Sequence, residues 1–283
     1  EYRRQRQMCI RDSASTEPES IHGSDILVVS VPTQFIRSVF GSYDFQVRDV
    51  RIANASKGIE NKSLLRVSQL LREVCKIDRD NYAVLTGPSH AEEVVRGVPT
   101  TILAASSDEE TAMHIQNAFS NATFRVYRSN DVIGAELGGA LKNVIAIAAG
   151  IIDGLGTGDN TKAALITRGL AEITRLGVVL GANPATFSGL SGLGDLIVTC
   201  DSRHSRNRHV GEEIGRGKSL QDVLAETPMI AEGVATTESA FQLAQRYHVE
   251  MPIVEQVYHI LFNSKSPRQA VHELMTRESK SEV

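Results

Sequence analysis

The feature that most constrains the fold is a change in hydrophobic periodicity near Asp131. Upstream of it, short β-branched runs alternate with stretches of helical periodicity, and downstream of it nearly every segment is helical. Near-continuous apolar strands joined by helices predict a doubly wound parallel sheet covered on both faces, which is an α/β fold. The strand-like runs are residues 25–32, 50–56, 82–87, 100–106 and 124–128, with helices expected at 34–40, 64–76, 91–96 and 109–119.

The second half is predicted to be an all-helical C-terminal domain. Glycines and the dipeptides Asn183-Pro184 and Met251-Pro252 separate its helices. The chain therefore divides into a sheet domain over residues 25–130 and a helical domain over 131–283. We expect a cleft between the two, where ligand sites preferentially occur. The helices are expected at residues 133–152, 162–181, 205–215, 220–226, 237–247, 253–262 and 267–277.

Residues 1–24 are predicted to be a non-native or disordered start. The sequence has no initiator Met, and residues 1–12 show neither strand alternation nor a helical stripe. The string RQRQMCIRDS looks like translated sequencing-adapter read-through, and a genuine disordered tail is the alternative.

No glycine-rich turn of the form GxGxxG follows any strand-like run. In dinucleotide-binding sheets this phosphate-binding turn follows the first strand. Two interpretations are open at this point: the chain is not a dinucleotide binder, or that part of it has been cut away.

Composition excludes several classes of protein. Apolar residues make up 41% and charged residues 23%, as in soluble globular proteins. The net charge of −4 argues against a nucleic-acid partner. The longest apolar run, residues 144–152, is far shorter than the roughly 20 residues of a membrane span, and no secretory signal is visible. The three cysteines lack CxxC spacing and the eight histidines lack metal-ligand grouping, so no metal is expected and a reducing cytoplasm fits best.

Lys142 is the strongest candidate for a catalytic group. It lies in the apolar stretch IGAELGGALKNVIAIAAGII, and a lysine is almost never fully buried without a partner. Small residues share its helical face, which leaves room for a substrate or for another backbone. The alternative is tight helix packing with the ammonium escaping to solvent. If the side chain is buried, its pKa falls toward the range that suits general acid–base catalysis.

Two strand ends carry further candidates. Lys57 comes directly after the run that ends at Ser56, and the carboxyl end of a strand faces the ligand crevice in open α/β sheets. In TGPSHAEEV (86–94), Ser89 can cap a helix whose first amides could hold an anion. An ordinary loop lysine and a simple helix cap are the alternatives.

A fourth signal follows the run Gly189–Cys200, in which Asp195 is the only acid. Ser205 is a natural N-cap, so Ser205, Arg206 and Asn207 would present a hydroxyl, a guanidinium and an amide at one helix start. This set suits a phosphate, because arginine binds phosphate bidentately and a helix start favours negative charge. A solvated basic loop is the alternative.

One charged helical face is interpreted as structural only. Lys162, Arg168, Glu172 and Arg175 share a face in the second half. We predict that they form a solvated, salt-bridged surface without a chemical role.

Taken together, these stretches resemble the bacterial-type NAD(P)-dependent glycerol-3-phosphate dehydrogenases. The resemblance runs in order from about Asp25 to the C-terminus, and the long central string is its most specific part. The strings that carry it are VVSVPTQ, ASKGIE, TGPSHAEEV, FRVY, DVIGAELGGALKNVIAIAAGIIDGLGTGDNTKAALITRGLAEITRLG, GLSGLGDLIVTC, SRNR, AEGVATTES and VEMPIVEQVY.

The resemblance implies a Rossmann-like sheet domain, NAD or NADP as cofactor, and reduction of dihydroxyacetone phosphate to sn-glycerol 3-phosphate for glycerophospholipid synthesis. It implies that Lys142 is the general acid–base group that protonates the C2 oxygen. The implied substrate-binding residues are Lys57, Gly87, Ser89, Lys142, Asp195, Ser205, Arg206 and Asn207. The implied cofactor-binding residues are Lys57, Ala91, Arg206, Ile230 and Glu232.

The departure from the family is at the start, where members open with a strand, a glycine-rich turn, a helix and a second strand. We therefore expect an N-terminally truncated, partial sheet domain that binds cofactor poorly and aggregates. A cytoplasmic location and a homodimer are further expectations. The alternatives are a non-catalytic remnant that binds glycerol phosphate and a related β-hydroxyacid dehydrogenase with another substrate.

Overall fold

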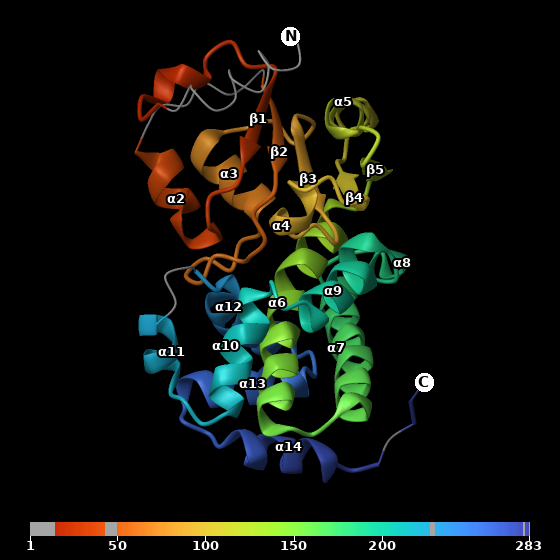
Figure 1. Ribbon diagram of the computed structural model, residues 1–283. Coiled ribbons are helices and arrows are strands. Elements are labelled where there is room, and N and C mark those ends of the chain that lie inside the picture. Colours follow the sequence, from red (N-terminus) through yellow and green to blue (C-terminus); the bar gives the residue numbers. More distant parts are fainter. Residues whose placement is uncertain (1–14, 43–49, 227–229, 280, 283) are drawn as a thin grey trace.

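A computed structural model describes residues 15–42, 50–226, 230–279 and 281–282. It contains a strand-and-helix domain joined to a helical domain, as predicted (Figure 1). The adapter-like residues 1–12 lie outside the described residues. Within residues 15–24 the chain forms the short 3-10 helix η1 (Pro18–Ile21).

The sheet has five described strands in the order in which they occur along the chain. Three neighbouring pairs are parallel, but β3 and β4 are antiparallel, with Val84 opposite Ala105. The strands are β1 (Ile26–Val29), β2 (Arg51–Asn54), β3 (Tyr82–Thr86), β4 (Thr100–Ala105) and β5 (Phe124–Ser129).

The prediction of an entirely parallel sheet is therefore wrong at β4. A parallel return needs a crossover long enough to carry the chain back along the sheet. The connection from β3 to β4 contains only α4 (Ala91–Val94), and four helical residues span about 6 Å. The chain consequently returns in the opposite direction to β3.

Helices cover both faces of the sheet, as the apolar strands predicted. α2 (Thr33–Gly41) and α3 (Val67–Cys75) share one apolar cluster with Ile52 and Val84. α5 (Glu109–Phe119) packs through Ile115 on the alternate strand residues Ala53, Ala83 and Leu85. The side-chain alternation of the strands thus separates two cores, one on each face.

α6 (Val132–Leu155) is the central element of the helical domain (Figure 1). Its length and apolarity would suit a membrane span, but the apolar window is completely buried inside the protein, so packing explains its composition. The helices around it include α7 (Asp159–Val179), α8 (Pro184–Phe187), α9 (Asp195–Asp201), α10 (Arg206–Gly215), α11 (Leu220–Glu226), α12 (Glu232–Tyr247), α13 (Pro252–Phe262) and α14 (Pro267–Met275).

Glycines bring α6 and α10 into backbone contact. A Cβ added to Gly150 would lie 1.9 Å from the Arg208 carbonyl oxygen, and one added to Gly211 would lie 2.0 Å from the Ile147 carbonyl oxygen. No larger residue fits between backbones this close. Gly150 of α6 and Gly211 of α10 thus allow the backbones of the two helices to come into contact.

The prediction of a solvated surface is wrong for Glu172. Its side chain is buried, and its two carboxylate oxygens accept hydrogen bonds from Ile253 N and Val254 N at the start of α13. These amides have no partner within their own helix, which explains why a buried carboxylate is placed there. Lys162 does form ion pairs, with Asp153 and Asp201.

Candidate active site

A buried lysine–aspartate pair lies where the two domains meet. Lys142 on α6 is 6% exposed, and its Nζ lies 2.5 Å from Asp195 Oδ1 and 2.7 Å from Thr199 Oγ1. Asp195 is the first residue of α9, Thr199 lies one helical turn later, and Thr199 Oγ1 donates to the Asp195 carbonyl oxygen. The ammonium therefore does not escape to solvent, contrary to the structural alternative.

A second lysine, Lys57 from the sheet domain, contacts the same aspartate. Its Nζ lies 2.7 Å from Asp195 Oδ2 and donates to the Gly87 carbonyl oxygen at 3.2 Å. Asn54 at the end of β2 fixes the turn before the lysine, because its side chain bonds both the N–H and the carbonyl of Ser56. Gly87 has φ +138°, and a Cβ there would lie 3.0 Å from Ile102 Cα, so glycine is required.

One carboxylate thus lies between two ammonium groups. Burial lowers the pKa of Lys142 to about 8, because the Asp195 charge only partly offsets desolvation and Lys57 adds a second positive charge. Burial alone would raise the pKa of Asp195, but the two lysines outweigh it and hold that pKa below its ordinary value. The cluster retains one excess positive charge that can stabilise a polarised carbonyl oxygen.

Three polar side chains, those of Ser205, Arg206 and Asn207, lie together at the start of α10. Ser205 is the N-cap, and its Oγ accepts a hydrogen bond from Arg208 N at 3.2 Å. Asn207 Oδ1 accepts from Gly233 N, so its amide NH₂ group is the part left to face the cavity. Arg206 is exposed and its Nη1 donates to the Ile230 carbonyl oxygen.

A cavity of about 430 Å³ connects these groups. Lys142, Lys57 and Asp195 line it together with the Ser205-Arg206-Asn207 helix start. Glu232 also lines it, is half-buried and accepts a hydrogen bond from Thr33 N at 2.8 Å, which joins α12 to the start of α2. The full lining is Ala55, Lys57, Ser89, His90, Ala91, Glu92, Lys142, Asn143, Asp195, Thr199, His204, Ser205, Arg206, Asn207, Ile230 and Glu232.

All but one of the catalytic, substrate-binding and cofactor-binding candidates named from the sequence lie in this lining. The exception is Gly87, which borders the cavity through its carbonyl contact with Lys57. Ser89 Oγ donates back to the Gly87 carbonyl rather than capping α4.

Sequence reasoning missed Thr199, His90 and His204. Thr199 follows Asp195 by one helical turn, a spacing that would have identified it if the segment had been interpreted as a helix. The rings of His90 and His204 lie 6.0 Å apart at the cavity wall. Burial, aided by the nearby Lys142 charge, lowers the pKa of His90.

The fold and the site define a two-domain α/β protein with a cationic small-molecule site at the domain boundary. Residues 12–112 match the family model of the NAD-dependent glycerol-3-phosphate dehydrogenase N-terminus, and residues 131–272 match that of the C-terminus. The chain belongs to the NAD-dependent glycerol-3-phosphate dehydrogenase family.

Individual relatives agree with this assignment. A glycerol-3-phosphate dehydrogenase from Geobacter sp. (strain M21) is 53% identical over 266 residues, covering 93% of this chain and 79% of the relative. One from Lysinibacillus sphaericus (strain C3-41) is 54% identical over 262 residues, covering 92% and 78%. The crystal structure of glycerol-3-phosphate dehydrogenase from Coxiella burnetii has a TM-score of 0.86 at 35% identity, covering 93% and 81%.

Proposed function

We propose that this chain reduces dihydroxyacetone phosphate to sn-glycerol 3-phosphate with NADH or NADPH, a reaction that feeds glycerophospholipid synthesis. The observation that carries the proposal is the convergence of the Lys142–Asp195–Lys57 cluster and the Ser205-Arg206-Asn207 helix start on one cavity. The Geobacter and Lysinibacillus relatives are named as NAD(P)+ enzymes acting on glycerol 3-phosphate.

The helix start is the proposed site for the substrate phosphate. Arg206 can bind two phosphate oxygens, and the first amides of α10 favour a negative charge. The Ser205 hydroxyl and the Asn207 amide add neutral donors on the same side of the cavity. Together they would hold the substrate with its carbonyl toward the lysine cluster.

Lys142 is the proposed proton donor to the C2 oxygen in the reduction and the proton acceptor in the oxidation. Asp195 keeps its ammonium in place, and Lys57 in turn bonds the second carboxylate oxygen of Asp195. The excess positive charge of the cluster would stabilise the negative charge that develops on the oxygen before it is protonated. A pKa near 8 allows either direction at neutral pH.

We assign the nicotinamide end of a dinucleotide to the part of the cavity lined by Ala55, Ala91 and Ile230. Ala55 and Ala91 are small, and Ile230 is 47% exposed, so together they leave an accessible apolar edge beside the lysines. Arg206, which bonds the Ile230 carbonyl oxygen, and Glu232 supply polar groups at that edge, and Lys57 lines the same cavity. When bound, the reduced nicotinamide supplies the hydride.

The direct test is oxidation of NADH and of NADPH with dihydroxyacetone phosphate, beside dihydroxyacetone without its phosphate. We expect turnover with the phosphorylated ketone and at least about 100-fold lower kcat/KM without the phosphate, because the donors at α10 would lose their charged partner. A second arm adds a relative's glycine-rich strand–turn–helix segment, since the printed sequence has no GxGxxG turn. Equal rates on both ketones would favour another hydroxyacid substrate, and no turnover in either arm would favour the binding-remnant alternative.

The two reaction directions should depend on pH in opposite ways. Reduction needs the Lys142 ammonium, so kcat should fall as the pH rises through about 8, whereas oxidation needs the free amine and should become faster over the same interval. Steady-state assays in both directions from about pH 6 to about pH 10 would check this. Profiles that change in the same direction would contradict the assignment of Lys142.

We also propose that the protein is a cytoplasmic homodimer. Cys75 and Cys200 are free thiols, in keeping with a reducing compartment. Light scattering after size-exclusion chromatography would measure the mass of the assembly, and a mass of one chain would contradict the dimer.

A further inference from the structure

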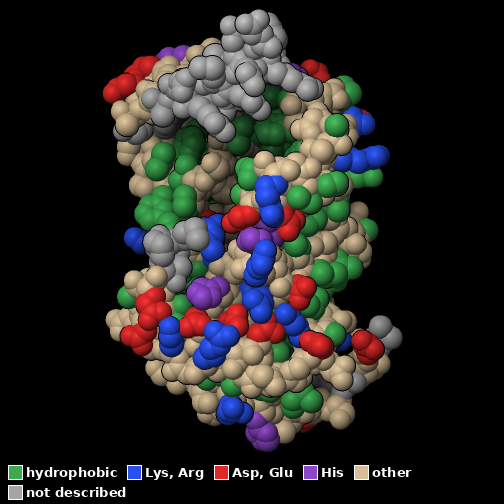
Figure 2. Space-filling view, in the orientation of Figure 1, with side chains coloured by type: hydrophobic (Ala, Val, Ile, Leu, Met, Phe, Trp, Pro, Cys, Tyr) green, Lys and Arg blue, Asp and Glu red, His purple; other side chains and the backbone are tan. Residues whose placement is uncertain are grey.

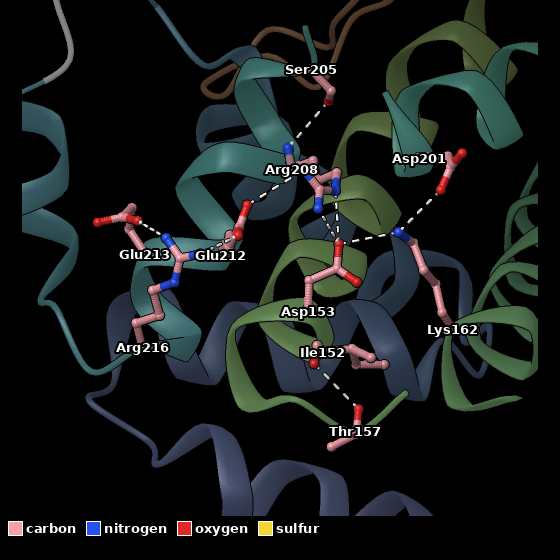
Figure 3. Close-up of polar contacts among 10 residues, drawn as sticks. All are labelled: Ile152, Asp153, Thr157, Lys162, Asp201, Ser205, Arg208, Glu212, Glu213 and Arg216. Atoms are coloured by element: carbon pink, nitrogen blue, oxygen red, sulfur yellow. Dashed lines mark hydrogen bonds and ion pairs between the residues drawn. The ribbon is translucent and has the colours of Figure 1, made fainter. Parts of the chain in front are cut away.

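Asp153, near the C-terminal end of α6, lies at the centre of a group of ion pairs (Figure 3). Its Oδ2 accepts Arg208 Nε at 2.7 Å and lies 2.7 Å from Arg208 Nη2. The same oxygen accepts Lys162 Nζ at 3.1 Å, and Lys162 continues to Asp201 Oδ1 at 3.3 Å. The side chains of Asp153, Arg208 and Lys162 are only 20%, 19% and 14% exposed, so the pairs of Asp153 with Arg208 and with Lys162 are poorly screened by solvent, whereas Asp201 is 78% exposed.

The helices that these pairs join are the ones that carry the proposed site. α6 carries Lys142, and Asp153 follows it by about three helical turns on the same face. α9 carries Asp195 and ends at Asp201, while α10 begins at Arg206. The short loop 202–205 between α9 and α10 is therefore connected to Asp153 at both ends. Before the loop, Asp201 bonds Lys162 of α7, which bonds Asp153, and after the loop Arg208 bonds Asp153 directly.

Arg208 connects this group to the phosphate donors directly. Its backbone N–H donates to the Ser205 cap, while its guanidinium pairs with Asp153 (Figure 3). Glu212, one turn later, pairs with the same guanidinium at 3.4 Å. Arg208 thus holds the first turn of α10 in two ways, through its backbone N–H to the N-cap Ser205 and through its side chain to Asp153.

Packing sets how near α6 and α10 lie and buries Val210 and Ile214 of α10 in one cluster with Ile147 and Ile151 of α6. The ion pair of Asp153 adds a contact of a different kind at the start of α10. Two guanidinium nitrogens of Arg208 contact one carboxylate oxygen of Asp153. Such a contact is directional, so it restrains the first turn of α10, where the proposed phosphate donors lie. Figure 2 shows acidic and basic side chains gathered in a band across the helical half of the molecule.

We propose that Asp153 is a positioning residue of the phosphate site. Its ion pairs with Arg208 and with Lys162, which also bonds Asp201, hold the loop 202–205 in place. The Ser205-Arg206-Asn207 helix start is thereby directed toward the substrate phosphate. The inference rests on the proposed function only in taking that helix start as the phosphate site. Asp153 itself does not line the cavity and touches no reacting group.

The test is Asp153→Asn, which preserves the shape of the side chain and removes its charge. We expect the dissociation constants of sn-glycerol 3-phosphate and of inorganic phosphate, measured by calorimetry without cofactor, to rise about tenfold, the scale of one misplaced charged contact. In turnover, KM for dihydroxyacetone phosphate should rise by a similar factor. Both kcat and KM for the nicotinamide cofactor should change by less than about twofold.

The matched control is Glu213→Gln. Glu213 lies on the same helix and pairs with Arg216 and Lys218, at the end of α10 remote from Ser205. This variant should leave both dissociation constants unchanged. If the asparagine variant does not fold, Arg208→Lys takes its place, because lysine keeps the charge but cannot give Asp153 two nitrogen contacts from one planar group.

The outcomes separate the inference from the proposed function. Unchanged anion affinity in a folded Asp153→Asn protein, or equal loss in Glu213→Gln, would show a merely structural role and overturn the inference. A wild-type chain that binds neither anion would overturn it as well. A wild-type chain that binds both anions but does not reduce dihydroxyacetone phosphate would refute the proposed function, and the calorimetric comparison would still decide the role of Asp153.

Discussion

Replacing Lys142 with methionine is expected to lower the turnover of dihydroxyacetone phosphate by a factor of about 100 or more, the scale of a lost acid–base group. Methionine has a similar length and no charge, so it can occupy the buried space on α6. The variant lacks the ammonium that bonds Asp195 Oδ1 and Thr199 Oγ1, and Lys57 bonds the other carboxylate oxygen of Asp195. Steady-state kinetics in both directions would measure the loss.

The control for this experiment is Lys218→Met. Lys218 forms ion pairs with Glu213 and Glu226 on the exposed side of the helical domain, so the same change of residue type there should leave turnover unchanged. Thermal unfolding should show that both variants are folded. A folded Lys142→Met protein with at least a third of wild-type kcat would rule out Lys142 as the proton donor.

The second large effect concerns stability, and it is expected from Gly150→Ala. The added methyl carbon would lie 1.9 Å from the Arg208 carbonyl oxygen and 2.7 Å from Glu212 N, both backbone atoms of α10. Relief requires the two helices to separate, because neither neighbour can rotate away. We expect the free energy of unfolding to fall by about 3 kcal/mol or more, at the upper end for an overpacked core.

Thermal unfolding measures this change as a fall in Tm of about 10 °C for a chain of this size. Gly41→Ala is the matched control, since a Cβ there would meet only Val74 Cγ1, at an ordinary 3.8 Å. Alanine in place of Gly41, the last residue of α2, should leave Tm nearly unchanged. If both variants unfold at the wild-type temperature, α10 does not lie against α6 as described.

The importance of Lys142 was predictable because its neighbours in the sequence are apolar and predict that its helix is buried. An apolar helix of this length must be covered on all sides, and a lysine within it must then find a partner or lose its proton. The partner itself was not predictable. Asp195 lies 53 residues further along the chain, and nothing local to either residue relates them.

The segment 189–200 shows why Thr199 was not identified from the sequence. Its glycines at 189, 192 and 194 weaken any helical pattern, since glycine has a low helix propensity. In the structure this stretch forms a π-helix, Leu190–Gly194, that continues into α9. Gly192 is needed there because a Cβ would lie 2.0 Å from the Phe187 carbonyl oxygen, a tertiary contact that the local sequence does not reveal.

The sequence by itself determined the α/β class, the division near Asp131, and the strand ends and helix starts on which the candidate residues lie. These properties follow from periodicity and capping, which act over a few residues. Only the tertiary structure decided the antiparallel direction of β4, the burial of Glu172 under α13 and the pairing of Lys142 and Lys57 on one carboxylate. Each of these depends on groups far apart in the chain, whose energies are set by desolvation and packing after the helices have met.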